Sequence, residues 1–384
     1  MAKHYRYGGS TAGRTIQCPA WIPLAQKMPI SEDGNGNDFA DLGTLKHNAM
    51  EALGTSDIEF EDLIGMTYND QVLTEEMLVE DIKPAQFAYE EFADEHDLQL
   101  ELYEQQVKID EEIGGTADLI AVNSDTVFIM DWKFGYNLVS PVENPQGLFY
   151  ALCALEDPRT AKLFEGRDKI VIGIMQPEYL NQGYDSMIQT WETDMAHLNA
   201  FADSYFDALE NQDAEKPCAG DHCKYCPAMV ICPVKTGQAR AATMLDPKSE
   251  DVKVLAQALE LADTVIEWAN AVKKFAHEQA ELGTKIDGYK LVAKRATRKW
   301  TDEEEVLDIV RKAKKLKLEE ATTIKLLSPA QLEKVMKKKD LDFEKYASYI
   351  ESVSTGTTLT TADDKRPEVF NSTALADALT LIND

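Results

Sequence analysis

Three short segments between residues 100 and 133 constrain the fold of this 384-residue chain more than any other feature. LELYEQQVKI, TADLIAV and TVFIMDWK are alternating or continuous apolar runs, a pattern typical of β-strands. The turn-rich DEEIGG and the short NSD separate them. We therefore predict a meander of three consecutive strands.

Helical patterns flank this meander on both sides. Apolar positions recur at helical spacing from Asp38 to Leu53, with Asp38 as the expected N-cap. Further helices are expected at about 71–95, 141–155 and 193–211, and KIVIGIMQ and DSMIQTWET add two strands. This alternation predicts an α/β core with one main sheet. Residues 8–30, punctuated by Gly, Pro and Ser, are interpreted as an irregular segment before the loop SEDGNGND.

We expect three regions along the chain: a core at 1–235, a mainly helical region at 236–350, and a polar, partly disordered tail at 351–384. The formal charge of −29 argues against a general basic surface for nucleic acid. Most of this charge lies in residues 1–250, which hold 44 acidic and 17 basic residues. Basic clusters around Arg298, Arg311 and Lys334 are either solvated helix faces or a surface that contacts phosphates.

No targeting or membrane signal stands out in the sequence. The longest apolar stretches fall short of the roughly 18 to 20 residues that a membrane helix needs. The N-terminus MAKHYRYGGS lacks the apolar core of a signal peptide. We expect a soluble, cytoplasmic protein with no membrane partner.

Charged residues interrupt two of the predicted strands. Asp118 lies in GGTADLI, and Asp131 and Lys133 lie in FIMDWKFG. Because Asp131 and Lys133 are two residues apart, a strand points both to one face. Two carboxylates on neighbouring strands can hold a hard divalent cation, with the lysine free to steady a phosphate or a water. A buried Asp–Lys pair at a sheet edge is the alternative.

The surrounding motifs resemble the RecB-type branch of the PD-(D/E)XK nuclease superfamily, in the same order along the chain. The motifs are Gly43-Thr44-x-x-His47-x-x-x-Glu51, Gly115-x-x-Asp118, Asp131-x-Lys133 and Gln146-x-x-x-Tyr150. The C-terminal stretches GYKLV, RKWTD and DDKRP further resemble a phage and prophage family of undescribed function that carries this core. The superfamily's proline before its first acidic residue is replaced here by Ala117.

This resemblance implies a restriction-endonuclease-like core, with a central mixed sheet flanked by helices and a helical C-terminal extension. It implies that His47, Asp118 and Asp131, joined by the main-chain carbonyl of Trp132, bind one or two Mg²⁺ or Mn²⁺ ions. Lys133 would then be the catalytic lysine, and Gln146 and Tyr150 would orient the DNA or the lysine. Glu104 on the first strand is an acidic residue without an assigned role.

Four of the six cysteines lie close together between Cys218 and Cys232. The spacing Cys223-x-x-Cys226-x-x-x-x-x-Cys232 lets thiolates reach one metal or cluster, with a fourth ligand from elsewhere. The segment resembles that of AddB-like iron–sulfur nucleases, which implies a [4Fe-4S] cluster completed by Cys18. A zinc site completed by Cys218 or His222 is the alternative. Cys153, in an apolar run, is interpreted as a core residue.

The resulting functional hypothesis is a metal-dependent deoxyribonuclease, an exonuclease on single-stranded DNA or DNA ends. It would serve phage recombination, replication or DNA processing in a bacterial host cytoplasm, with DNA and a phage recombination or replication protein as partners. One alternative is a catalytically silent DNA-binding or scaffold subunit of a helicase or annealing complex. Another, resting only on the acidity of residues 51–100, is a DNA mimic.

Overall fold

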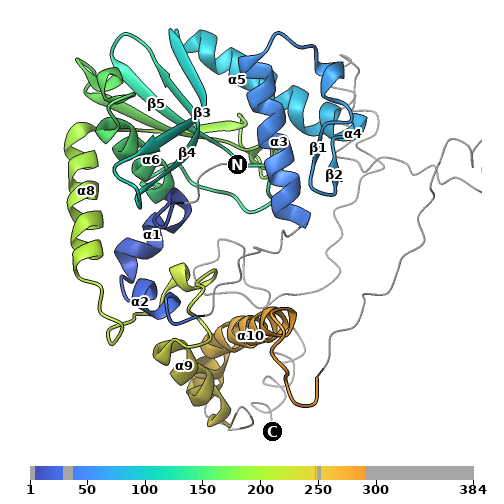
Figure 1. The fold of residues 1–384 in the computed structure, drawn as a ribbon, viewed down its shortest axis with the longest axis vertical. Coiled ribbons are helices and arrows are strands. Elements are labelled where there is room, and N and C mark those ends of the chain that lie inside the picture. The colour runs from blue at the N-terminus through green and yellow to red at the C-terminus, as the bar shows by residue number, and fades with distance from the viewer. Residues whose placement is uncertain (1–4, 29–37, 247, 249–251, 290–384) are drawn as a thin grey trace, which may run out of the picture. The chain divides into compact units, whose positions relative to one another are not determined.

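The computed structural model of the protein describes residues 5–28, 38–246, 248 and 252–289, and the chain up to Val292 belongs to one compact unit. Its centre is a five-stranded sheet with the order β3-β4-β5-β6-β7 (Figure 1). The strands are β3 (Leu100–Lys108), β4 (Gly114–Val122), β5 (Thr126–Trp132), β6 (Lys169–Met175) and β7 (Ile188–Asp194). Only β5 and β6 pair in parallel, and the other neighbours are antiparallel.

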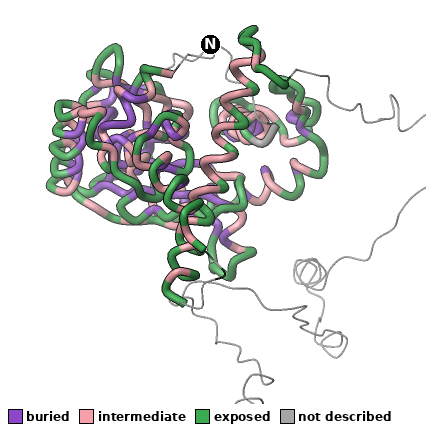
Figure 2. Tube along the Cα trace, turned by 90° about the horizontal axis from the view of Figure 1, so that it is seen from below, coloured by how far each residue is buried: buried purple, intermediate pink, exposed green. Residues whose placement is uncertain are grey.

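Helices cover both faces of this mixed sheet. One face packs against α1 (Gly9–Gln17), α6 (Pro145–Glu156) and α8 (Met195–Glu210), and the other against α3 (Asp38–Thr55) and α5 (Lys83–Glu95). A cluster of buried apolar residues lies between the sheet and the helices on each face. Both clusters are among the buried residues of the trace in Figure 2. Every residue of β5 is buried, which is the pattern of a strand covered on both faces. The predicted α/β class is confirmed, and the arrangement is compatible with a restriction-endonuclease-like core.

Shorter elements complete the description. They are α2 (Trp21–Ala25), η1 (Phe60–Leu63), β1 (Thr67–Tyr68), β2 (Gln71–Val72), α4 (Glu75–Met77), the π-helical η2 (Leu78–Ile82), η3 (Ala161–Phe164), α7 (Glu178–Asn181), η4 (Asp221–Cys223), α9 (Pro233–Thr243) and α10 (Val252–Glu281). The helix expected at 71–95 therefore begins after a small hairpin and contains a π-turn. No helix within the described ranges is long and apolar enough to cross a membrane.

The interpretation of residues 8–30 as irregular is wrong, because they contain α1 and α2. Two glycines make the sequence of α1 a poor helix former, and close packing against α6 stabilises it instead. A Cβ atom at Gly9 would lie 2.8 Å from the ring of Tyr150, and one at Gly13 would lie 3.1 Å from Pro145. Glycine is therefore needed where α1 approaches α6.

Several sequence predictions fall outside the described residues. These are the part of the mainly helical region 236–350 that follows Tyr289, its basic clusters, and the polar tail at 351–384. Most of the loop SEDGNGND lies outside them as well. The described part of the region expected to be helical contains α10, which contacts α9.

Candidate active site and cysteine site

Three acidic residues form a row across neighbouring strands. β3 and β4 keep one register on both sides of Glu104, which places Glu104 opposite Asp118. The β4–β5 ladder ends at Leu119 opposite Met130, so Asp118 and Asp131 are the next residues of the two strands. Because opposed residues of a sheet point to the same face, the three carboxylates face one another. Glu104 has a φ of 42°, a strained backbone conformation for a residue with a side chain.

His47 reaches this row from α3. Its Nδ1 lies 3.3 Å from Asp118 Oδ1, and ligand atoms of His47, Glu104 and Asp118 all lie within 4.8 Å of one another. The other oxygen of Asp118 accepts the backbone N–H of Trp132 at 2.7 Å. Asp118 is thus held between a helix and the adjacent strand, with a nitrogen and a second carboxylate beside it.

Asp131 belongs to a second group of contacts, with Lys133 and Gln146. Lys133 Nζ lies 2.7 Å from Asp131 Oδ2, and Gln146 Nε2 donates to Asp131 Oδ1 at 2.9 Å. Lys133 Nζ also donates to Gln146 Oε1 at 3.4 Å, which closes a triangle of three side chains. Asn144 caps α6 by accepting the backbone N–H of Gln146, which fixes the start of that helix. The ammonium group of Lys133 is therefore held in one place.

Tyr150 lies one turn further along α6, in a niche made by two glycines. A Cβ atom at Gly9 would lie 2.8 Å from its ring, and one at Gly115 would lie 2.9 Å from it. The glycine of the Gly115-x-x-Asp118 motif thus makes room for this ring beside β4. Burial raises the pKa of Tyr150, and the nearby charges of Asp118 and Asp131 act in the same direction. The hydroxyl stays protonated at neutral pH.

Crowding of the carboxylates changes their protonation. Burial, followed by the charge of Asp118, raises the pKa of Glu104 to about 7. Burial and Asp118 also raise the pKa of Asp131, although Lys133 opposes this shift. Burial lowers the pKa of His47, but the charge and hydrogen bond of Asp118 outweigh it, so the net shift is upward. Negative charge at the row is thus in excess over its nearby cations.

These residues fit a divalent cation. A carboxylate row with one imidazole provides oxygen and nitrogen ligands of the kind that Mg²⁺ and Mn²⁺ accept. Asp131 Oδ2 is buried, and the ammonium of Lys133 lies 2.7 Å from it. A cation would relieve the repulsion that raises the carboxylate pKa values. The donors the structure groups most closely are His47, Glu104 and Asp118, so Glu104 joins the set expected from the sequence.

The resemblance implies the main-chain carbonyl of Trp132 as a metal ligand, while the side chain of Trp132 belongs to the core. Its indole is buried, 1% exposed, and packs edge to face on Tyr89 at 5.4 Å. Its backbone N–H holds Asp118, and its pairing with β6 continues into Lys133, whose N–H donates to the carbonyl of Met175 at 2.9 Å. The Trp132 backbone therefore helps to position both Asp118 and Lys133.

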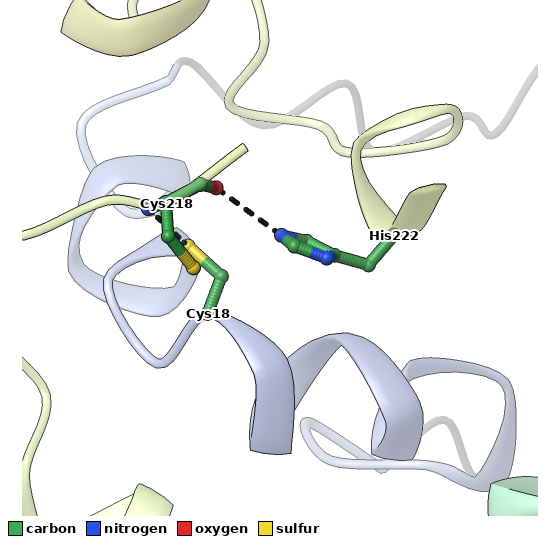
Figure 3. Close-up of side chains that lie close together, drawn as sticks. All are labelled: Cys18, Cys218 and His222. Atoms are coloured by element: carbon green, nitrogen blue, oxygen red, sulfur yellow. Dashed lines mark hydrogen bonds between the residues drawn. The ribbon is translucent and has the colours of Figure 1, made fainter. Parts of the chain in front are cut away.

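The cysteines form a separate site beneath α1. Five of them line one cavity together with His222, namely Cys18, Cys218, Cys223, Cys226 and Cys232. Cys18 ends α1, and the backbone N–H of Cys218 donates to its Sγ at 3.5 Å (Figure 3). His222 lies beside Cys218, with a ring nitrogen 3.2 Å from its carbonyl oxygen (Figure 3). Ligand atoms of Cys18, Cys218 and His222 lie within 4.8 Å of one another.

Arg14 ties the two parts of the cysteine site together. Its guanidinium donates to the carbonyls of His222 at 3.3 Å and Tyr225 at 2.9 Å, and lies 5.2 Å from the centroid of Trp21. Burial lowers the pKa of Arg14, and the nearby cysteines oppose this shift. This half-buried cation favours the deprotonated, metal-binding form of the nearby thiols, against the burial that raises the pKa of Cys226 to about 11.

Two further residues considered in the sequence are Cys153 and Glu51. Cys153 is a residue of α6 and is fully buried in the core, and burial raises the pKa of its thiol, so it stays a neutral packing residue. Glu51 is half-buried on α3, and its charge contributes to the raised pKa of Glu104. It has no closer role in the arrangement described above.

Comparison with protein families gives one match that spans most of the chain. Residues 4–367 match the family described as Protein of unknown function (DUF2800). The chain belongs to this family.

Proposed function

We propose that this DUF2800 protein is a metal-dependent deoxyribonuclease that hydrolyses phosphodiester bonds of DNA. The observation that carries the proposal is the row Glu104, Asp118 and Asp131, with His47 at one end and the Lys133–Gln146 pair at the other. Carboxylates, an imidazole and a fixed ammonium gathered around one site are the parts that metal-assisted phosphodiester hydrolysis needs.

The residues of the chain have separate tasks in this proposal. His47, Glu104, Asp118 and Asp131 would hold Mg²⁺ or Mn²⁺, which when bound polarises the phosphate and favours deprotonation of a water. Lys133 offers positive charge to a phosphate oxygen or orients the attacking water. Gln146 fixes Lys133 and Asp131 relative to each other through its two hydrogen bonds. Tyr150, protonated and fixed, can donate a hydrogen bond to the DNA backbone.

The substrate is proposed to be single-stranded DNA or a DNA end, in phage recombination, replication or DNA processing. An acidic protein of charge −29 gains little from long-range attraction to DNA, so binding depends on local cations at the site. A phage recombination or replication protein would then be the partner that delivers DNA. The bound divalent ions would provide part of the local positive charge.

The cysteine site is proposed to hold a [4Fe-4S] cluster through Cys18, Cys223, Cys226 and Cys232, with a structural role. The alternative is zinc, for which the close group of Cys18, Cys218 and His222 provides three ligands. Metal analysis of anaerobically purified protein and its visible absorption separate the two. Iron that survives Cys218→Ser supports the cluster, whereas zinc that is lost from Cys218→Ser and from His222→Ala supports the alternative.

The test of the nuclease proposal is digestion of DNA labelled at the 5′ or 3′ end, single- or double-stranded, with Mg²⁺ or Mn²⁺. We expect metal-dependent products from the wild type and at least a ~100-fold lower rate from Lys133→Ala. Lys216→Ala, which removes an 82% exposed lysine side chain on the surface, is the matched control and keeps the wild-type rate. The label released gives the polarity. Metal-replete wild type that cleaves none of these substrates would contradict the proposal and favour a silent DNA-binding subunit.

A further inference from the structure

The segment that follows β5 leaves the sheet beside the acidic row. β5 and β6 are parallel, so the segments after both strands leave at the same edge of the sheet. The segment after β5 begins with Lys133 and runs to the start of α6 at Pro145. Residues 133–144, here called the β5–α6 loop, therefore border the proposed site of phosphate hydrolysis.

One buried glutamine fixes the middle of this loop. Gln176, fully buried after β6, donates through Nε2 to the carbonyls of Gly135 at 2.6 Å and Asn137 at 2.9 Å. Its Oε1 accepts the backbone N–H of Val139 at 3.1 Å. The hydroxyl of Tyr179, on α7, donates to the carbonyl of Val139. The backbone on both sides of Tyr136 is thus fixed by hydrogen bonds to Gln176 and Tyr179.

The start of the loop is fixed on its other side by α3. The ring of Phe134 meets the imidazole of His47 edge to face, with centroids 6.0 Å apart. The ammonium of Lys46 lies 5.5 Å from the centre of the same ring. The position of the loop is therefore tied to a residue of the proposed metal site.

Tyr136 projects from this fixed backbone into solvent. Its exposure is 82%, among the highest of the large apolar residues in the described chain. Tyr184, in the segment between β6 and β7, is 45% exposed and packs against Tyr179 with ring centroids 5.1 Å apart. Exposing an aromatic ring costs hydrophobic free energy, and a backbone held by several hydrogen bonds presents that ring with little loss of entropy on binding.

We propose that Tyr136 is a stacking surface for a base of single-stranded DNA, and that it places the neighbouring phosphate at Lys133. This inference rests on the proposed function and names how that site selects its substrate. Tyr136 is three positions after Lys133 in the sequence, a reach of at most about 10 Å, so the stacked base belongs to a nucleotide near the cleaved bond. Stacking accepts any base and is available only when the base is not paired in a duplex.

The charge of the protein strengthens this assignment. Most proteins that bind single strands combine a basic groove with aromatic side chains. This chain has a formal charge of −29, and the cations described at the site are few. Base stacking must then supply a larger share of the binding free energy, and the affinity depends less on salt than in a basic protein.

The experiment measures binding of the full-length protein to a fluorescein-labelled single-stranded oligonucleotide by anisotropy. It uses the Lys133→Ala background with Mg²⁺, so that no cleavage interferes. We expect Tyr136→Ala to weaken binding by about 5- to 150-fold, the range of one stacked base. Tyr136→Phe keeps the ring and stays within about 2-fold of the parent. Tyr289→Ala, at 81% exposure, is the matched control and also stays within about 2-fold.

An oligonucleotide with an abasic position near the cleaved bond gives a second readout. Removing the stacked base should weaken binding to the parent but have little effect on binding to Tyr136→Ala. The abasic strand and the Tyr136→Ala variant each remove the same base–ring contact, so their effects should not add. Blunt duplex DNA should bind equally with and without the Tyr136 ring. Thermal melts of Tyr136→Ala should match the parent, since the removed atoms are exposed.

Several outcomes would overturn the stacking role. These are an effect of Tyr136→Ala below 2-fold, an equal effect on duplex DNA, additive losses with the abasic strand, or no measurable binding of single strands. Tighter binding of an RNA strand of the same sequence would overturn the assignment to DNA. If the wild type binds single strands through the Tyr136 ring but never cleaves DNA, the stacking role holds and the nuclease proposal is contradicted. If DNA is cleaved at the same rate with and without the Tyr136 ring, the nuclease proposal holds and the stacking role is contradicted.

Discussion

The acidic row and the cysteine site are assembled in opposite ways. Glu104, Asp118 and Asp131 lie within 28 residues on three consecutive strands, and ladder hydrogen bonds set their positions. Cys18 and the segment 217–235 come from chain positions some 200 residues apart and meet on helix ends and turns. The sheet can hold its carboxylates against their own repulsion. The cysteine site lacks such a scaffold, so we expect it to depend on its metal.

The largest expected effect follows from removing a cysteine ligand. Cys226→Ala should lose its metal and lower the free energy of unfolding by about 4 kcal/mol, as for a long-range cross-link. For a core of this size that corresponds to a melting temperature lower by about 8–16 °C. Cys153→Ala, at a fully buried thiol outside the cysteine site, is the control and should keep the metal at a cost of about 1 kcal/mol. Metal analysis and thermal melts check both, and a folded, metal-replete Cys226→Ala would contradict the comparison.

The acidic row, unlike the cysteine site, is expected to form without its ion, so metal binding should add stability to a site that is already folded. At a Mn²⁺ concentration one hundred times the dissociation constant, the wild type should gain about 2.7 kcal/mol over chelated protein. Asp118→Asn should lose this gain and be no less stable than wild type in chelator. Asp125→Asn, at an exposed turn beside the same sheet, should keep the gain. Calorimetry checks these values, and an undiminished Mn²⁺ effect in Asp118→Asn would remove that residue from the metal site.

Arg14 offers a finer test of how the cysteine site is held. Arg14→Gln removes a half-buried charge and its hydrogen bonds to two carbonyls, which should cost about 2 kcal/mol and speed metal loss to a chelator. Arg14→Lys should lie in between. Arg6→Gln breaks an exposed pair with Glu112 and should cost at most about 1 kcal/mol. Equal rates of metal release from the Arg14 and Arg6 variants would show that Arg14 has no special role.

The smallest expected effect concerns pH. Burial and Asp118 raise the pKa of Glu104 from 4.5 to about 7, so its carboxyl binds a proton more tightly in the folded state. In chelator, its contribution to stability is then complete below about pH 4.5 and is lost as the pH rises through about 7. Glu104→Gln should therefore gain on the order of 1 kcal/mol over wild type at about pH 8, with little difference at about pH 5. Parallel melting curves at the two pH values would contradict the placement of Glu104 in the row.

The sequence predicts most of the sheet because its strands are short, apolar and separated by clear turns. It also places Asp131 and Lys133 on one face, since a period of two requires it. Glu104 could not be assigned in this way, because its partner depends on the register that the DEEIGG turn imposes. Helix α1 was missed because its glycines disfavour a helix until α6 packs against them. Gln176 was missed because the loop it fixes is distant in sequence.

Helix α1 has a consequence for the whole molecule. Near its start, Gly9 receives the ring of Tyr150, and at its end Cys18 enters the cysteine cavity. Nine residues of helix form a stiff rod about 13 Å long. We expect a chain that has not yet acquired its cysteine-bound metal to leave this rod loose and Tyr150 poorly seated, which hydrogen exchange of α6 would reveal. Metal binding at the cysteine site would then precede ordering of the acidic row, and under the proposed function the chain would not cleave DNA before it holds that metal.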